Sequence, residues 1–190
     1  MTKYILHGGA TSADSVHNDN FFKEMIKDLD SPANVLLIYF ATVEDRWDSL
    51  LEDDKSKFAK ANQENKDLVF SVAAKETDKL IEQISEADLV YMRGDKHTGV
   101  LVEKMLKVRN LTELFDGKIV GGSSAGAYAI SKYFHSDSMG GIFEGLGLLP
   151  IKCTAHYSKE KDPQVENLKN FKEELKVCAI PETEFIVIEK

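Results

Sequence analysis

Short runs of β-branched and aromatic residues alternate with amphipathic segments along this chain of 190 residues. The runs predict strands at residues 3–7, 34–40, 67–72, 88–92, 118–122 and 151–157. Apolar residues at helical spacing predict helices between them, within residues 21–29, 47–58, 80–84 and 100–108. This alternation predicts an α/β fold with a doubly wound, mainly parallel sheet that has helices on both faces.

The end of the chain carries two further apolar runs, at residues 177–180 and 184–190, on either side of a turn at Pro181. They suggest a closing pair of strands. No internal repeat, low-complexity tract or Pro/Ser linker interrupts the pattern of the chain. We therefore expect a single domain that spans residues 1–190.

Charge and cysteine content exclude several classes of partner. The formal net charge of -8 comes from acidic and basic residues mixed along the chain, with no Lys/Arg block to follow a phosphate backbone. Cys153 and Cys178 lie in apolar runs without metal-type spacing, which predicts buried thiols in a reducing compartment. No apolar stretch has the length of a signal h-region or a membrane span. We expect a cytoplasmic protein without nucleic-acid or membrane partners.

The segment "GGSSAGA" follows an expected strand and precedes residues 127–134, which we expect to form a helix. Gly122, Ser124 and Gly126 have the G-x-S-x-G spacing of a nucleophile elbow. Small neighbours suit a sharp turn from strand to helix, and the helix N-terminus can stabilise an oxyanion. The spacing alone leaves two alternatives open, a serine that merely caps the helix and a phosphate-binding loop.

A nucleophilic serine needs a general base. The five histidines of the chain are His7, His17, His97, His135 and His156. His156 and His97 each follow an expected strand, at the edge where catalytic groups of open α/β sheets gather, and His156 is the leading candidate. His7 precedes a Gly pair, which favours a structural turn. Too little chain follows Ser124 for the remaining sheet and cap of an α/β-hydrolase.

Five segments in order along the chain resemble the peptidase E family of aspartyl dipeptidases and cyanophycinase-like serine peptidases. They are residues 36–47, 87–99, 121–127, 145–157 and 179–189. The resemblance implies a fold similar to that of class I glutamine amidotransferases (flavodoxin-like), with serine in place of the nucleophilic cysteine.

The same resemblance implies roles for individual residues. Ser124 would be the nucleophile and His156 the general base that later protonates the leaving amine. Glu182, in the turn "PET", would hold the His156 ring, and Asp137 on the loop after the elbow helix is the alternative acid. The backbone N–H groups of Gly94 and Ala125 would form the oxyanion hole.

The chain departs from the family pattern near Gly94. Met92 and Arg93 replace small residues, from which we expect a bulkier and more basic pocket floor, and Ser123 stands where peptidase E has a large aromatic residue. The candidates for substrate contacts in and around this turn are Arg93, Asp95, Lys96 and His97, each with solvated surface charge as the alternative.

The predicted function is a serine peptidase that hydrolyses short peptides through an acyl-enzyme on Ser124. Dipeptides with an N-terminal Asp are the candidate substrates that the resemblance implies. The alternatives are an amidase or esterase on a non-peptide substrate, and a non-catalytic amidotransferase-like binding module. We expect no cofactor. We also expect no metal, because the histidines are scattered and no C-x-x-C pair is present. The expected oligomeric state is a monomer or a homodimer.

Overall fold

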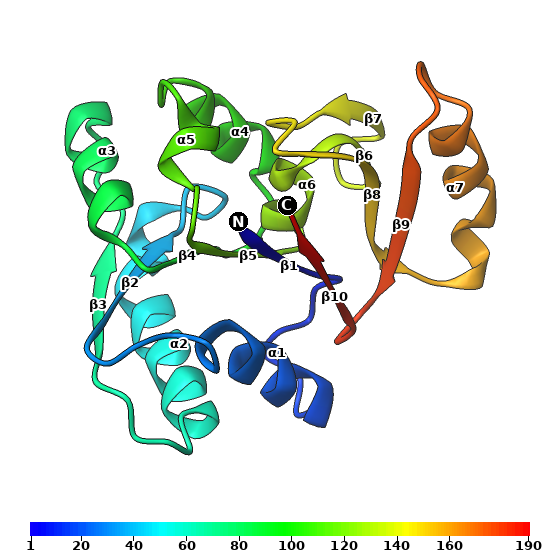
Figure 1. Cartoon of the computed structure of the whole chain (residues 1–190). Coiled ribbons are helices and arrows are strands. Elements are labelled where there is room, and N and C mark those ends of the chain that lie inside the picture. The colour runs from blue at the N-terminus through cyan, green and yellow to red at the C-terminus, as the bar shows by residue number, and fades with distance from the viewer.

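The strands form two separate sheets in the computed structural model, which describes residues 1–190 (Figure 1). The larger sheet has the order β10-β1-β5-β4-β2-β3. Its strands are β1 (Lys3–His7), β2 (Ala33–Ile38), β3 (Leu68–Val72), β4 (Leu89–Met92), β5 (Ile119–Ser123) and β10 (Phe185–Glu189). All neighbouring pairs are parallel except β1 and β10. The strands predicted from the first five runs therefore belong to one sheet.

Helices cover both faces of the larger sheet, as predicted (Figure 1). One face carries α1 (Val16–Ile26) and α2 (Trp47–Ala61), the second of which follows a short 3₁₀ turn at Glu44–Arg46. The other face carries α3 (Thr77–Glu86), α4 (Thr98–Leu106), α5 (Leu111–Leu114) and α6 (Ala125–Ile130). Along β2, Val35 and Leu37 pack on the first face, and Leu36 and Ile38 pack on the second. This alternation explains why the strand is almost continuously apolar.

The smaller sheet, with the order β7-β6-β8-β9, lies beside α6 and the β1–β10 edge (Figure 1). Its strands are β6 (Ser131–Ser136), β7 (Gly141–Glu144), β8 (Leu149–Tyr157) and β9 (Lys176–Pro181). A 3₁₀ turn at Lys159–Lys161 and α7 (Asp162–Lys169) connect β8 to β9. Cys153 and Cys178 face each other across β8 and β9 as buried free thiols, and burial raises the pKa of both.

Two sequence expectations about connections are wrong. The two last strands do not pair with each other, because β9 pairs with β8 whereas β10 crosses to the larger sheet and pairs with β1. The turn at Pro181 redirects the chain between the sheets, with Thr183 at a positive φ of 65°. The helix after "GGSSAGA" is also shorter than expected, since α6 ends at Ile130 and residues 131–136 form β6.

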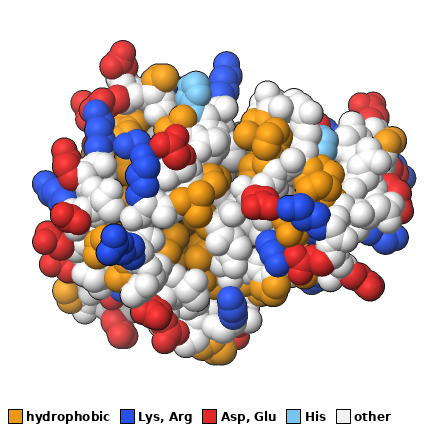
Figure 2. Space-filling model, turned by 90° about the horizontal axis from the view of Figure 1, so that it is seen from above, with side chains coloured by type: hydrophobic (Ala, Val, Ile, Leu, Met, Phe, Trp, Pro, Cys, Tyr) orange, Lys and Arg blue, Asp and Glu red, His pale blue; other side chains and the backbone are white.

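The surface matches the mixed charge of the sequence. On the face seen in Figure 2, acidic and basic side chains are interspersed and no extended basic patch is present. None of the helices combines the length and the apolar character needed to cross a membrane.

Candidate active site

Ser124 sits at the sharp turn between β5 and α6, with backbone angles of φ 48° and ψ -107°. A side chain on Gly122 would meet the Gly126 backbone at 2.5 Å, and one on Gly126 would meet the Met92 carbonyl oxygen at 2.0 Å. The close approach of α6 to β4 and β5 therefore requires the two glycines. Ser124 precedes the first helical residue, yet its hydroxyl makes no capping hydrogen bond. The helix-capping alternative is thus not what the structure shows.

The Ser124 hydroxyl lies instead 2.9 Å from His156 Nε2. His156 occupies an irregular point of β8, where the register with β9 shifts between Thr154 and Tyr157 and where its own φ is 53°. The bulge turns the imidazole out of the regular strand alternation and toward the elbow. The ring is partly open to solvent, with 37% of the side chain exposed. Ser124 and His156 therefore meet from two different sheets.

The sequence offers two candidate acids, Glu182 and Asp137, as partners for His156 Nδ1. Glu182 Oε1 lies 2.8 Å from His156 Nδ1, whereas Asp137 Oδ2 pairs with Lys161 Nζ at 2.7 Å. The hydrogen bond from Lys161 lowers the pKa of Asp137, with burial opposing it. The structure thus brings Ser124, His156 and Glu182 together in one chain of hydrogen bonds and leaves Asp137 on the pocket wall.

The end of β1 connects the elbow, the histidine and the acid-bearing turn. Three consecutive carbonyl groups accept backbone hydrogen bonds there: His7 from Ser124 at 2.9 Å, Gly8 from His156 at 2.8 Å, and Gly9 from Thr183 at 3.0 Å. Gly9 has a φ of 108°, and a Cβ on it would lie 2.2 Å from the His156 ring. We refer to residues 7–9 as the β1 junction.

The ring of His7 holds the β1 junction in place through two hydrogen bonds. His7 is fully buried; its Nδ1 accepts the Gly9 N–H at 3.0 Å and its Nε2 bonds Asn18 Oδ1 at 2.9 Å. The first contact requires that Nε2 carries the proton. Burial lowers the pKa of His7 to about 4, so the ring is neutral at neutral pH. Sequence reasoning placed His7 in a structural turn through its Gly pair, but no signal identified Asn18.

The two predicted oxyanion-hole residues lie beside Ser124. Ala125 is the first residue of α6, so its N–H has no acceptor within the helix. Gly94 packs against the elbow: a Cβ on it would lie 2.7 Å from Ser124 Cβ and 2.8 Å from Ala125 N. The Gly94 N–H donates to Ser123 Oγ at 3.1 Å, and this hydroxyl also bonds Tyr91 OH at 3.0 Å.

A polar pocket of about 410 Å³ opens around Ser124 and His156. Its lining includes Gly9, Thr11, Lys96, Ser136, Asp137 and Lys161. Only two of the lining residues are hydrophobic, which suits a small polar ligand. No group of three or more His, Cys, Asp or Glu side chains is arranged to hold a metal ion.

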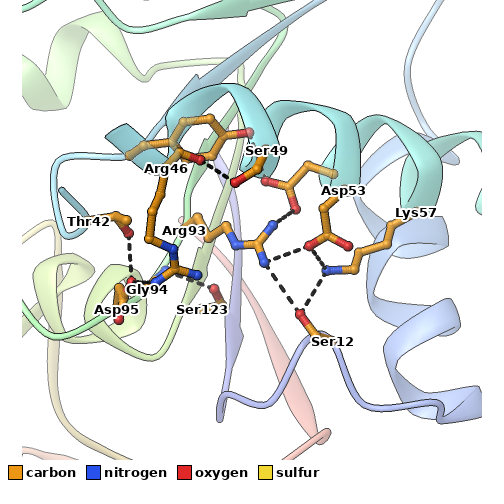
Figure 3. A network of polar contacts seen from close by, with 12 residues as sticks. Ser12, Thr42, Arg46, Ser49, Asp53, Lys57, Arg93, Gly94, Asp95 and Ser123 are labelled. Atoms are coloured by element: carbon orange, nitrogen blue, oxygen red, sulfur yellow. Dashed lines mark hydrogen bonds and ion pairs between the residues drawn. The ribbon is translucent and has the colours of Figure 1, made fainter. Parts of the chain in front are cut away.

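The turn after β4 differs from its sequence expectation. Met92 is buried in the core and Arg93 pairs with acids on α2, and neither lines the pocket. The expected bulkier and more basic pocket floor is therefore wrong, because both side chains point elsewhere. Asp95 lines the pocket but accepts hydrogen bonds from the side chains of Thr42 and Arg46 (Figure 3). His97 is exposed at the start of α4 and lies outside the pocket lining.

Comparisons with known proteins bear on the whole chain. The model of peptidase family S51 matches residues 4–190. The crystal structure of a peptidase from an acI-B1 Actinobacterium is similar with a TM-score of 0.69 and 20% identity, covering 100% of this chain and 84% of that one. A crystal structure from Listeria monocytogenes EGD-e, whose name relates it to peptidase E, has a TM-score of 0.69 and 16% identity, covering 99% and 94%. No curated protein matches. The structural likenesses confirm the predicted fold class.

Proposed function

The chain belongs to peptidase family S51 and is a serine peptidase, and on this premise we propose that its acyl-enzyme forms on Ser124. The observation that carries the proposal is the hydrogen-bonded series from Ser124 Oγ through His156 to Glu182, with steps of 2.9 and 2.8 Å. A nucleophile, a base and a group that orients the base occur here in the order that acyl transfer needs.

The proton transfers follow from this arrangement. With the His156 Nδ1–H donating to Glu182, the lone pair on Nε2 faces the Ser124 hydroxyl. His156 removes the hydroxyl proton while Oγ attacks the scissile carbonyl carbon, and the imidazolium then donates that proton to the departing amine. A water molecule, deprotonated by the same ring, attacks the acyl-enzyme; the bond between the acyl carbon and Ser124 Oγ breaks, the imidazolium returns the proton to Oγ, and the acid is released. The Glu182 carboxylate stabilises the imidazolium in both halves of the reaction.

We propose that the N–H groups of Ala125 and Gly94 stabilise the negative charge on the tetrahedral intermediate. Both lie against Ser124, and Ala125 N–H is at the positive end of α6. The Gly94 N–H exchanges its hydrogen bond to Ser123 Oγ for one to the oxyanion. A single donor of this kind contributes about 10²- to 10³-fold in kcat.

We propose short peptides as substrates, with dipeptides that carry an N-terminal Asp as the first class to test. The support is the size and polarity of the pocket, which accepts a short polar chain. Lys96 on the pocket wall offers an ammonium group to a substrate carboxylate. The pair formed by Asp137 and Lys161 on another part of the wall offers both charges to a zwitterion.

A panel of dipeptides and tripeptides with free and blocked termini tests this proposal. We expect turnover of some members, covalent labelling of Ser124 by a fluorophosphonate, and loss of both in Ser124→Ala. Ser85→Ala, at the exposed end of α3, is the matched control and retains wild-type rates. Peptide turnover that survives in Ser124→Ala would contradict the mechanism.

Two results would replace the substrate proposal. Hydrolysis of activated esters with no peptide turnover favours an amidase or esterase on a non-peptide substrate. Folded wild-type protein that no fluorophosphonate labels at Ser124 favours a binding module in which the elbow is only a turn.

A further inference from the structure

Arg93 directly precedes Gly94, and its side chain is almost completely buried on the α2 side of the larger sheet. Its backbone N–H still belongs to the sheet, donating to the Ile38 carbonyl at 3.1 Å. The guanidinium extends toward α2 (Figure 3), and Arg93 does not line the pocket around Ser124. There it makes two ion pairs, from Nη1 to Asp54 at 2.5 Å and from Nη2 to Asp53 at 2.7 Å.

Asp54 makes this contact difficult to replace. Its side chain is completely buried, and an ionised carboxylate without partners in such a place is strongly destabilising. Besides Arg93, Asp54 accepts a hydrogen bond from Tyr39 OH at 2.9 Å. Burial raises the pKa of Asp54 to about 6, with the positive charge of Arg93 opposing the rise. Asp54 and Arg93 thus depend on each other for a stable place in the core.

Hydrogen bonds connect these ion pairs to a second loop. Asp53 Oδ2 is shared between Arg93 and Lys57 Nζ, which lies 2.6 Å away. Both cations also contact Ser12 Oγ, Arg93 at 3.4 Å and Lys57 at 3.3 Å (Figure 3). Ser12 belongs to the loop that follows the β1 junction. The charged side chains of this cluster are two cations and two anions, so the cluster carries no net charge.

Every residue of the turn at 93–95 is anchored. Arg93 is bound to α2, the Gly94 N–H to the Ser123 hydroxyl, and Asp95 to the side chains of Thr42 and Arg46. Of the three anchors, only the first pairs a buried cation with a fully buried anion. Because Gly94 packs directly on Ser124, a displacement of this turn also displaces the Gly94 N–H relative to the nucleophile.

We propose that Arg93 is a positioning residue of the peptidase: its ion pairs with Asp53 and Asp54 fix the Gly94 N–H at the distance from Ser124 that the oxyanion requires. The inference rests on the proposed function, since it assigns Gly94 to the oxyanion hole. Arg93 itself touches no substrate. Its planar fork can hold two carboxylates in fixed directions, which the single ammonium group of a lysine cannot do.

Three variants of the full chain test the role. Arg93→Met combined with Asp54→Leu replaces the buried pair by apolar side chains of similar length, a change that often preserves stability. Arg93→Lys keeps the charge but loses the fork. Lys107→Met removes an exposed ion pair with Glu103 on α4 and serves as the control. For each, we measure thermal unfolding, kcat and KM on the best peptide of the panel, and the second-order rate of Ser124 labelling by a fluorophosphonate.

We expect the double variant to lower kcat and the labelling rate by about tenfold or more, with KM changed by less than about twofold, because oxyanion contacts act in the transition state. Arg93→Lys should fall between the double variant and the wild type, and Lys107→Met should match the wild type. A folded double variant that labels at the wild-type rate overturns the proposal. If the double variant does not fold, wild-type kinetics in Arg93→Lys overturn it instead. Failure of the wild type to label contradicts the proposed function itself and is a separate result.

Discussion

The two sheets contribute to the candidate site in different ways. The larger sheet supplies Ser124 at the end of β5, a strand in which every residue is buried. The smaller sheet supplies His156 from a bulge in β8, and Glu182 follows β9, a strand with only two buried residues, Cys178 and Ile180. The position of Ser124 depends on a local turn made possible by glycines. The positions of His156 and Glu182 depend on contacts between the sheets.

The β1 junction is where these two kinds of positioning meet. Its carbonyl groups hold the elbow, the histidine and the acid-bearing turn within a few residues of one another. The nucleophile is therefore held within its own sheet, to which His7 of the junction belongs, whereas the base and the acid are tied to that sheet through Gly8 and Gly9. Variants on either sheet, and in the junction between them, test this division.

The largest effect on activity is expected for Ser124 and His156, which come from different sheets and act together in catalysis. Ser124→Ala and His156→Ala should each lower kcat/KM by about 10⁴-fold or more, and the double variant should lose no more than either single variant. Steady-state kinetics on the best peptide of the panel measures all three. Losses that multiply in the double variant would show that the two residues act independently.

A side chain introduced at Gly9 should disturb the β1 junction, which connects the two sheets. In Gly9→Ala the new methyl group meets the His156 ring, and the positive φ adds backbone strain. We expect a loss of about 10²-fold in kcat, since a shift of about 1 Å in a catalytic group has that effect. Gly117→Ala is the matched control, because Gly117 also has a positive φ of 75° but has open space around it. Equal kinetics in the two variants would refute the role of the junction.

The two acids of the smaller sheet region should differ in effect. Glu182→Gln removes the charge beside His156 Nδ1 and should lower kcat by about 10- to 100-fold, less than for a buried triad acid because 59% of the Glu182 side chain is exposed. Asp137→Asn breaks an ion pair with Lys161 and should change kcat by less than about threefold. The reverse order of the two effects would assign the orienting role to Asp137.

The last effect concerns stability and pH and leaves catalysis aside. The pKa of His7 is about 4 in the folded protein against 6.5 for a free histidine, because burial disfavours the charged ring. The unfolded chain therefore binds a proton that the folded protein does not, and stability is lost as pH falls from about 6.5 to 4, by about 3 kcal/mol. Urea unfolding of wild type and His7→Gln at pH 7 and pH 4 checks this. The wild type should lose more stability than the variant, and parallel losses would contradict the shift.

The sequence predicted the larger sheet well because its strands are short apolar runs with buried neighbours on both sides. It predicted the meeting of Ser124 and His156 through the family resemblance. The expectation that both residues end strands at one sheet edge is wrong, because His156 lies on β8 of the smaller sheet. The conformation of His156 could not be predicted, since a positive φ in a non-glycine residue is held by a long-range contact with Gly8. The direction of Arg93 was missed for a similar reason, because Asp53 and Asp54 on α2 determine it.

The smaller sheet was harder to predict. Residues 131–136 follow a short alanine-rich helix without a proline or glycine to mark the change, so the sequence pattern predicts a longer helix. The exchange of β10 to the larger sheet also has no local signal, since either apolar run at the end of the chain can pair with several strands.

The β1 junction also sets the order in which the site can be completed as the chain emerges from the ribosome. Its carbonyl groups are synthesised first, Ser124 follows, and His156 and Glu182 come last. Contacts between residues so far apart in sequence close large loops and form late in folding. A nascent chain therefore carries the elbow serine before it carries the base and the acid, and the hydroxyl acquires its reactivity only when His156 and the turn at Thr183 have reached the β1 junction.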